Sequence, residues 1–429
     1  MTAQALNIIL IIPALLLIDL YVLNGIRGAF QKWHFLHKKA FTFLYWATSI
    51  GVICGLLTGV YVHFAGLGIR AAGLLIFSML FIGKLTFLPF LLIDDIKRLL
   101  AWRKNRFKNQ SVTHNALVPP DAIPRSEFLL KAGLLAGAIP LAAIKVNMPR
   151  GLYDYHVRYQ TLYLPNLPKA FNGIRLGQIS DIHSGSFYNK KAVLGGVEML
   201  LKEKPDFIFF TGDLVNGQTS EMRDYQDIFS KVKAPLGVYS SLGNHDYGDY
   251  GDYGDWQNPA DKIKDHQDLI LTHKNMGWDL LLNGNRRIKV DGEEIGILGI
   301  ENWSLYSRFP KYGRMDLATK NTDDIPVKLL LSHDPSHWQA QVLKDYPQVD
   351  VMFSGHTHGM QFGVRTKEFQ WSPIKYVYNE WAGHYQQGMQ QLYVNVGYGF
   401  VGLYGRVGIL PEITIFTLKA GHAPSGKLM

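Results

Sequence analysis

The sequence predicts an α-helical transmembrane module followed by an α/β domain, in which helices flank a two-sheet β-sandwich. Long aliphatic stretches lie before residue 150, whereas short β-rich runs alternate with helical patterns after residue 170. The charge also divides: residues 1–150 carry a net +11 and residues 151–429 a net −2. A chain of 429 residues is long enough for two or three domains. We therefore expect a membrane module at 1–150 and a second domain at 151–429.

The composition excludes several classes of protein. With 47% hydrophobic and 18% charged residues, the chain is not intrinsically disordered, because disorder requires weak hydrophobicity and high net charge. Its single cysteine, Cys54, excludes a disulfide scaffold and a cysteine-based zinc module. The basic excess belongs to the first part alone, so we expect no nucleic-acid partner.

Four apolar stretches define the first part, at about 5–23, 41–63, 71–93 and 128–144. A helix needs about 20 apolar residues to cross a bilayer, and the first three stretches meet that length. The first has no Lys or Arg before it, so it lacks the basic region of a cleaved secretory signal and is expected to be retained. The fourth is short and contains Lys131 and Pro140, which leaves three or four crossings open. Core helices of a soluble domain are the alternative, although aliphatic runs this long are rare there.

The positions of Lys and Arg predict the orientation of these helices. The loop after the first stretch and the segment after the third are basic, whereas the loop after the second carries only Arg70. Basic loops stay in the cytoplasm, so a fourth crossing would place residues after about 150 on the outer, periplasmic face of a bacterial inner membrane. The segment from Arg125 to Lys131 resembles a twin-arginine export signal that has lost one arginine, and it points to the same side.

Two charged residues, Asp19 and Lys84, fall within the apolar stretches. A charge that faces lipid is costly. We expect Lys84 to be buried inside the bundle or paired with Asp19. The alternative is that Lys84 reaches the interface or that a helix boundary is shifted.

The second part consists of short β-rich runs that end in polar loops. Five such runs lie at about 174–180, 207–211, 237–241, 327–331 and 350–353. Helical patterns lie near 191–202, 261–275 and 334–345, and further β-like runs near 294–300, 391–396 and 413–418. Strands separated by helices indicate α/β layering, with ligands bound beyond the strand ends. The additional β-like runs suggest a second sheet.

The loops after the five strands contain two Asp, one Asn and four His: Asp181, His183, Asp213, Asn244, His333, His356 and His358. Carboxylate, amide and imidazole groups suit divalent Mn, Fe or Zn. Seven ligands with one shared carboxylate would fill two sites and leave room for water. Two ions about 3.5–4 Å apart can activate a bridging water and hold a phosphate. We therefore expect two divalent metal ions and a phosphorylated substrate.

These loops, in the order D-x-H, G-D, G-N-H-D, a later His and G-H-x-H, resemble the pattern of the calcineurin-like metallophosphoesterase superfamily over about 170–420. The bacterial branch that is membrane-associated or carries twin-arginine-like signals is most similar. One departure from that branch is Met360, which occupies a position where a second glycine is usual. Because Met360 lies just beyond the predicted ligands, the departure affects the expected shape of the substrate site rather than metal binding. The resemblance implies that one ion is held by Asp181, His183 and His358, that Asp213 bridges, and that the other is held by Asn244, His333 and His356.

The resemblance also implies two catalytic residues. His245 would not be a ligand but would lie beside the phosphate and assist the leaving oxygen. Asp246 would orient His245, because a carboxylate can fix the tautomer of an imidazole.

These expectations combine into a membrane-anchored, metal-dependent phosphoric ester hydrolase. A metal-bridging hydroxide would attack phosphate mono- or diesters. A hydrolase of lipid-linked pyrophosphate, of the UDP-diacylglucosamine type, is the alternative within the class. A sensor or scaffold without turnover is the alternative from another class, which the intact ligand set disfavours. The Gly-Asp-Tyr loop at 247–256 could form a lid or place the carboxylate of Asp249, Asp252 or Asp255 next to a metal, and the alternative is a solvated loop.

Overall fold

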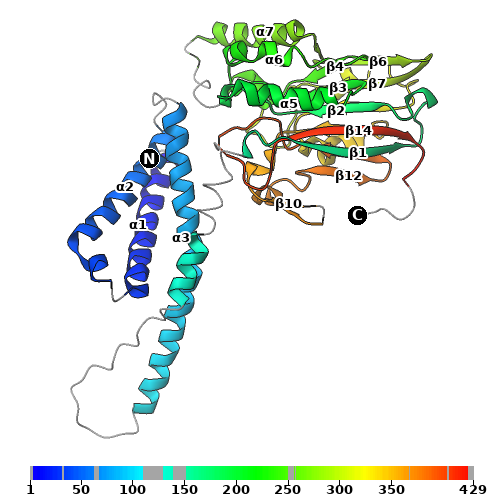
Figure 1. Ribbon diagram of the computed structural model, residues 1–429. Coiled ribbons are helices and arrows are strands. Elements are labelled where there is room, and N and C mark those ends of the chain that lie inside the picture. The colour runs from blue at the N-terminus through cyan, green and yellow to red at the C-terminus, as the bar shows by residue number, and fades with distance from the viewer. Residues whose placement is uncertain are drawn as a thin grey trace. The chain divides into compact units, whose positions relative to one another are not determined.

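The computed structural model describes residues 3–30, 33–61, 67–109, 129–138, 151–249, 256, 258–366, 368–402 and 405–423. The chain forms two compact units, Met1–Val146 and Asn147–Met429. The first is helical and the second is built from sheets and helices (Figure 1).

The first unit contains α1 (Ala3–Ala29), α2 (Lys39–Tyr61), α3 (Leu67–Asn109) and a short apolar helix at Leu129–Ala138. Among the described residues, the segments Ile12–Ala29 and Lys39–Leu57 are long and apolar enough to cross a membrane. Of the fourth apolar stretch, residues 128 and 139–144 lie outside the described part, as does Arg125.

Helix α3 is longer than the apolar stretch from which it was predicted, since it continues through the basic segment to Asn109. Lys, Arg, Leu and Ala are good helix formers. An ion pair between Asp95 and Arg98, 3.1 Å apart and three residues apart in sequence, supports the same turn. The first part of the segment predicted as a loop is therefore helical.

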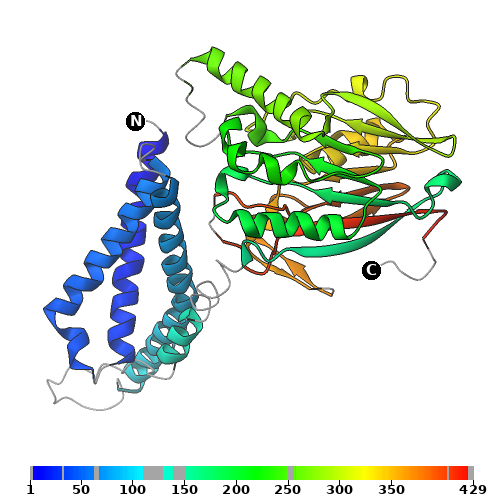
Figure 2. The same cartoon turned by 45° about the horizontal axis from the view of Figure 1, so that its top comes forward.

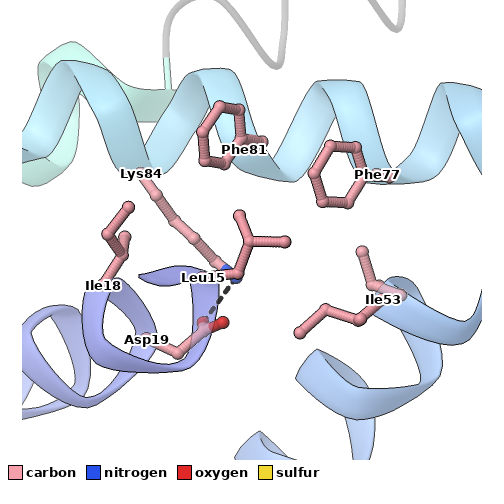
Figure 3. A pocket seen from close by; sticks show the side chains of 8 residues that line it. Leu15, Ile18, Asp19, Ile53, Phe77, Phe81 and Lys84 are labelled. Carbon is pink, nitrogen blue, oxygen red and sulfur yellow. Dashed lines mark ion pairs between the residues drawn. The ribbon is translucent and has the colours of Figure 1, made fainter. Parts of the chain in front are cut away.

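The predicted pairing of Lys84 with Asp19 is confirmed. Lys84 Nζ lies 2.5 Å from Asp19 Oδ1, and the Asp19 side chain is 3% exposed (Figure 3). The Tyr45 hydroxyl donates to Asp19 Oδ1 at 3.0 Å, and Lys84 donates to Ser49 Oγ at 3.4 Å. Because α1, α2 and α3 each contribute polar groups, the charges are satisfied within the bundle and need not face lipid.

The second unit contains two six-stranded sheets within its described residues, as the sequence predicted. The first sheet has the order β1-β14-β2-β3-β4-β5, with β1 at His156–Leu164, β2 at Arg175–Ile179, β3 at Phe207–Thr211, β4 at Val238–Ser241, β5 at Asp279–Leu280 and β14 at Glu412–Ala420. The second has the order β12-β13-β9-β8-β7-β6, with β6 at Gly284–Val290, β7 at Glu293–Gly299, β8 at Lys328–Leu331, β9 at Val351–Ser354, β12 at Gly383–Gln387 and β13 at Gln390–Val394. A small hairpin pairs β10 (Val364–Arg365) with β11 (Gln370–Trp371).

The two sheets pack face to face, and helices cover their outer faces. Strand β3 shows how the layers form: Phe207 and Phe209 face the core between the sheets, while Ile208 and Phe210 face the core under the helices. This alternation follows from the two-residue period of a strand. Helices α5 (Lys190–Lys202), α6 (Gln226–Phe229) and α7 (Pro259–Met276) lie along the first sheet (Figures 1 and 2). The short segments α8 (Met315–Ala318), Trp338–Val342 and α9 (Leu343–Asp345) pack on the second.

Strand direction decides where the polar loops gather. Strands β2, β3 and β4 are parallel in the first sheet, and β7, β8, β9 and β13 are parallel in the second. The carboxyl ends of parallel strands lie at one edge of a sheet, which is where ligands bind in such folds. The five polar loops follow these ends.

Candidate metal centre

The loops that carry the predicted ligands have an unusual backbone. Five of the seven predicted ligands adopt a positive φ: Asp181 (52°), His183 (49°), Asp213 (61°), His356 (73°) and His358 (50°). Residues other than glycine rarely adopt this left-handed conformation, which costs on the order of 1–3 kcal/mol each. Such strain persists only where the surrounding fold holds it, and it is typical of functional sites.

Six of the predicted ligands form two buried or nearly buried groups. Asp181, His183 and His358 form one group, and Asp213, His333 and His356 form the other, with the candidate ligand atoms of each group within 4.8 Å of one another. Oxygen Oδ2 of Asp213 lies 3.0 Å from His333 Nε2 and 3.5 Å from His183 Nε2. This oxygen therefore lies between a histidine of each group, as a shared ligand must.

The seventh predicted ligand, Asn244, lies at the start of a short helical turn, Asn244–Tyr247, that follows β4. The next residue of this turn, His245, donates its backbone N–H to Asp213 Oδ1 at 2.8 Å. The turn is thus held directly against the carboxylate that lies between the two groups.

The unsatisfied atoms of the site test whether a metal fits there. In the described part of the chain, the buried side-chain atoms that make no hydrogen bond include Nε2 of His183, His333 and His358 and Oδ1 of Asn244, and the three imidazole nitrogens lie 3.0–3.5 Å from carboxylate oxygens of the other predicted ligands. Leaving a buried polar atom unpaired costs about 1–3 kcal/mol. Four such atoms among the predicted ligands of two adjacent groups match the imidazole and amide donors that divalent Mn, Fe and Zn accept. The residues fit metal ions.

Hydrogen bonds to the opposite ring nitrogens orient three of the imidazoles. His183 Nδ1 is 3.0 Å from Asn216 Oδ1, and His333 Nδ1 is 2.7 Å from the Thr211 carbonyl oxygen. Each bond places the proton on Nδ1 and leaves Nε2 available for a metal. His356 is reversed, because its Nε2 is 2.8 Å from the Tyr378 hydroxyl, which leaves Nδ1 as its ligand atom.

The fourth imidazole, His358, is packed against a buried cation. Its Nδ1 lies 3.2 Å from Nη2 of Arg406, whose side chain is completely buried. The guanidinium donates to the carbonyl oxygens of Val396, Gly397, Gly399 and Ile409. Arg406 thereby ties the segments on both sides of the site to His358.

The protonation states suit metal binding. Burial lowers the pKa of the His183 and His358 imidazoles, which keeps them neutral. Burial opposes the charge on Asp181, but His358 and His333 outweigh it and lower the pKa of this carboxyl to about 2. Although burial acts in the opposite direction, Asp213 raises the pKa of His333 to about 10. A metal must displace that proton, so binding at His333 releases a proton at neutral pH.

The sequence predicts that Asp246 orients His245, which stays a prediction, and the structure gives both side chains backbone partners. His245 Nδ1 is 2.8 Å from the carbonyl oxygen of Asn216. The Asp246 carboxylate accepts backbone N–H groups at 2.8–2.9 Å from Asp213, Leu214 and Gly243. Burial, followed by the neighbouring Asp213, raises the pKa of Asp246 to about 7. Asp246 therefore shapes the loops that carry Asp213 and Asn244.

Several supporting residues were not predicted from the sequence. Asn216 holds His183 with its side chain and His245 with its carbonyl oxygen. Glu221 fixes the loops around Asn216, because its carboxylate accepts backbone N–H groups at 2.6–3.1 Å from Gly185, Asn216, Gly217 and Gln218. Tyr378 and Arg406 lie far along the chain from His356 and His358, which they contact, so no spacing could have revealed them. Asp334, which accepts a hydrogen bond from the Tyr378 hydroxyl at 3.2 Å, directly follows His333 and could have been found by that adjacency.

Part of the Gly-Asp-Tyr loop, residues 250–255, lies outside the described residues. At its borders, Asp249 pairs with Lys262, and Trp256 Nε1 donates to the Gly248 carbonyl oxygen at 2.8 Å.

Two family models match the chain. One, described as a probable calcineurin-like phosphoesterase transmembrane domain, matches residues 5–152. The other, described as calcineurin-like phosphoesterase, matches residues 174–360. The first match covers the helical unit. The second covers all seven predicted ligands and ends just after His358, so the later strands lie outside it.

Similar proteins occur in bacteria and animals. The uncharacterized metallophosphoesterase YkuE of Bacillus subtilis is 30% identical over 258 residues, which are 59% of this chain and 82% of YkuE. The transmembrane protein with metallophosphoesterase domain of Danio rerio is 28% identical over 295 residues, 67% of this chain, and the chain spans only 59% of its length. The phosphodiesterase YaeI of Escherichia coli is 26% identical over 246 residues, 56% of this chain and 80% of YaeI. With these matches and the metal-ligand groups at its strand ends, the chain belongs to the calcineurin-like metallophosphoesterases.

Proposed function

We propose that this chain is a membrane-anchored phosphoesterase that binds two divalent ions and hydrolyses phosphate mono- or diesters. The cluster of buried ligand atoms that make no hydrogen bond, on His183, His333, His358 and Asn244, carries the proposal. One ion is assigned to Asp181, His183 and His358 and the other to Asn244, His333 and His356, with Asp213 shared. Mn, Fe and Zn all suit this set of donors.

The predicted ligands and His245 are assigned different roles in the proposed reaction. Two divalent ions, when bound, supply Lewis acidity, a nucleophile derived from water and neutralisation of the charge that develops on the phosphoryl group. Asp213 holds the ligand groups at a fixed separation, since its Oδ2 contacts a histidine of each. His245 keeps its Nδ1 on the Asn216 carbonyl oxygen, so Nε2 is the nitrogen assigned to donate a proton to the leaving oxygen.

A substrate panel tests the proposed reaction. We expect the full-length protein, purified in nanodiscs and loaded with Mn, Fe or Zn, to hydrolyse phosphate mono- or diesters and to lose that activity on chelation. Hydrolysis confined to lipid-linked pyrophosphate would replace the proposed substrate with the alternative one. Two bound metals per chain without hydrolysis of any class would favour the sensor or scaffold.

Membrane anchoring and orientation are part of the same proposal. The two apolar segments Ile12–Ala29 and Lys39–Leu57 and the match to a transmembrane phosphoesterase domain support the anchor. Seven Lys and Arg residues follow the third apolar stretch, between Lys97 and Arg125. Because basic segments stay in the cytoplasm, the metal centre is assigned to the periplasmic side of a bacterial inner membrane.

Reporter fusions test this orientation. Alkaline phosphatase fused after residue 155 of the chain, expressed in a bacterium, is expected to be active, because the fusion point follows the fourth apolar stretch. The same reporter fused near residue 105 is expected to be silent, since the basic segment holds it inside. The reverse pattern would place the metal centre in the cytoplasm.

A further inference from the structure

Exposed apolar side chains gather in the loops beside the second ligand group. We define the apolar rim as Leu305, Met360, Val364, Phe369, Tyr376 and Val377, whose side chains are 45–75% exposed. Clustered apolar exposure of this kind marks interaction sites, whereas single exposed apolar residues are normal.

Hydrogen bonds tie the segments of the apolar rim to one another. The Tyr306 hydroxyl, next to Leu305, donates to the Val377 carbonyl oxygen at 2.5 Å. Ser372 Oγ donates to the Gly359 carbonyl oxygen at 2.7 Å, which joins the turn before Met360 to the hairpin. Hydrogen bonds therefore join the loops that carry the rim residues to one another.

Buried contacts also hold the rim in place. The β10-β11 hairpin carries Val364 and Phe369, and its Arg365 pairs with the buried Glu412 of β14. Met360 has a φ of 54°, a conformation that costs a residue with a side chain on the order of 1–2 kcal/mol, yet its side chain is 54% exposed. The fold therefore holds these exposed apolar side chains in fixed positions.

The apolar rim borders the metal centre directly. The ring of Phe309 lies 4.7 Å from the ring of His356, and Tyr378, the residue after Val377, bonds His356 Nε2 at 2.8 Å. A molecule with an apolar portion on the rim would therefore have its polar portion within reach of the second ligand group.

Cations accompany the aromatic rings of this surface. Lys375 Nζ lies 5.5 Å from the ring centroid of Tyr376, and the Arg308 guanidinium lies 4.5 Å from that of Phe309. Aromatic side chains beside Lys and Arg are typical of segments that rest at a membrane surface, where the rings occupy the headgroup layer and the cations meet anionic lipid.

The chain itself indicates which surface covers the rim. Its first unit contains α1 and α2, both apolar enough to cross a bilayer. The second unit, Asn147–Met429, follows this unit directly in the same chain. A bilayer is thus always within reach of the second unit, whereas no second copy is required.

We propose that the apolar rim rests in the headgroup layer of the membrane that the first unit spans, and that the metal centre acts on a phosphate ester anchored in that membrane. This inference rests on the proposed function and names its substrate class. The rim receives the apolar part of the lipid, and the neighbouring ligand groups receive its phosphate.

Fluorescence quenching by lipid tests the position of the rim. In a Cys54→Ser background of the full-length protein, Phe369→Cys is labelled with a small fluorophore and placed in nanodiscs that contain lipids spin-labelled near the headgroup. Met389→Cys is the matched control, because Met389 is 54% exposed and Phe369 59%. Met389 precedes β13, whose parallel partner β9 ends at the site, so it lies at the opposite edge of the sheet.

We expect the label at residue 369 to be quenched at least threefold more strongly than the label at residue 389. Equal quenching at both positions would overturn the proposal. Self-quenching at residue 369 that grows with protein concentration and is independent of lipid would also overturn it, in favour of a contact between two copies.

Kinetics separate this inference from the proposed function. Phe369→Ser is expected to lower kcat/KM on a phosphate ester carried by a vesicle on the order of tenfold, because the substitution removes the apolar area that the ring would bury in the bilayer, and to leave a water-soluble ester unaffected. Met389→Ser should change neither rate. An equal rate of Phe369→Ser and wild type on the vesicle substrate contradicts the rim proposal alone, whereas absence of metal-dependent hydrolysis of both esters by the wild type contradicts the proposed function.

Discussion

Asp213→Asn is expected to abolish hydrolysis, with a loss on the order of 10³-fold or more, and to lower the metal content from two ions per chain to fewer than one. The Asp213 carboxylate is the group that contacts histidines of both ligand groups, at 3.0 Å and 3.5 Å. Removing its charge weakens the binding of both ions, and the nucleophile that they would generate is then lost. Asparagine keeps the oxygen that accepts the backbone N–H of His245 at 2.8 Å, so the fold is expected to persist.

Elemental analysis and turnover on the same preparation check this result. Asp324→Asn is the control, because Asp324 is an exposed aspartate that pairs with Arg287 and is not among the predicted ligands. A cooperative thermal transition of both variants shows that they are folded. If Asp213→Asn retained two metals and ordinary turnover, a shared carboxylate would not organise the site.

The buried strands could be predicted because their sequences are short runs of apolar residues, which are typical of strands buried on both faces. The run 207–211 is apolar on both faces, as a strand between two cores must be, and it coincides with β3. The edge strands β6 and β12 were not predicted. Their sequences, Gly284–Val290 and Gly383–Gln387, are largely polar, and they become strands by pairing with β7 and β13.

The metal ligands could also be predicted from the sequence, whereas the residues that hydrogen-bond to the ligands and orient them could not. Each ligand follows a strand directly, so residue type and position in the chain were enough. Asn216 and Arg406 reach the site through loops that only the folded chain brings together. Asp246 was predicted to orient its neighbour His245, but its hydrogen bonds to backbone N–H groups of three loop residues could not be read from the sequence.

His245→Ala is expected to keep both metals while turnover falls about 10²–10⁴-fold on substrates with a poor leaving group. His245 follows the predicted ligand Asn244, so a metal-holding role is the simplest alternative. Two observations favour an acid instead. Its imidazole is half-buried rather than enclosed, and its Nδ1 lies 2.8 Å from the Asn216 carbonyl oxygen, which leaves Nε2 as the nitrogen assigned to the leaving oxygen.

The leaving group decides between the remaining roles of His245. An alkoxide needs a proton as the P–O bond breaks, whereas nitrophenolate departs without one, so the loss in His245→Ala should be steep for an alkyl ester and shallow for a nitrophenyl ester. His384→Ala is the matched control, since His384 bonds Gln391 at 2.8 Å and lies outside both ligand groups. Metal content and both rates can be measured on one preparation. Loss of a metal would make His245 a ligand, and an equal fall on the two esters would make it a phosphate-binding residue rather than an acid.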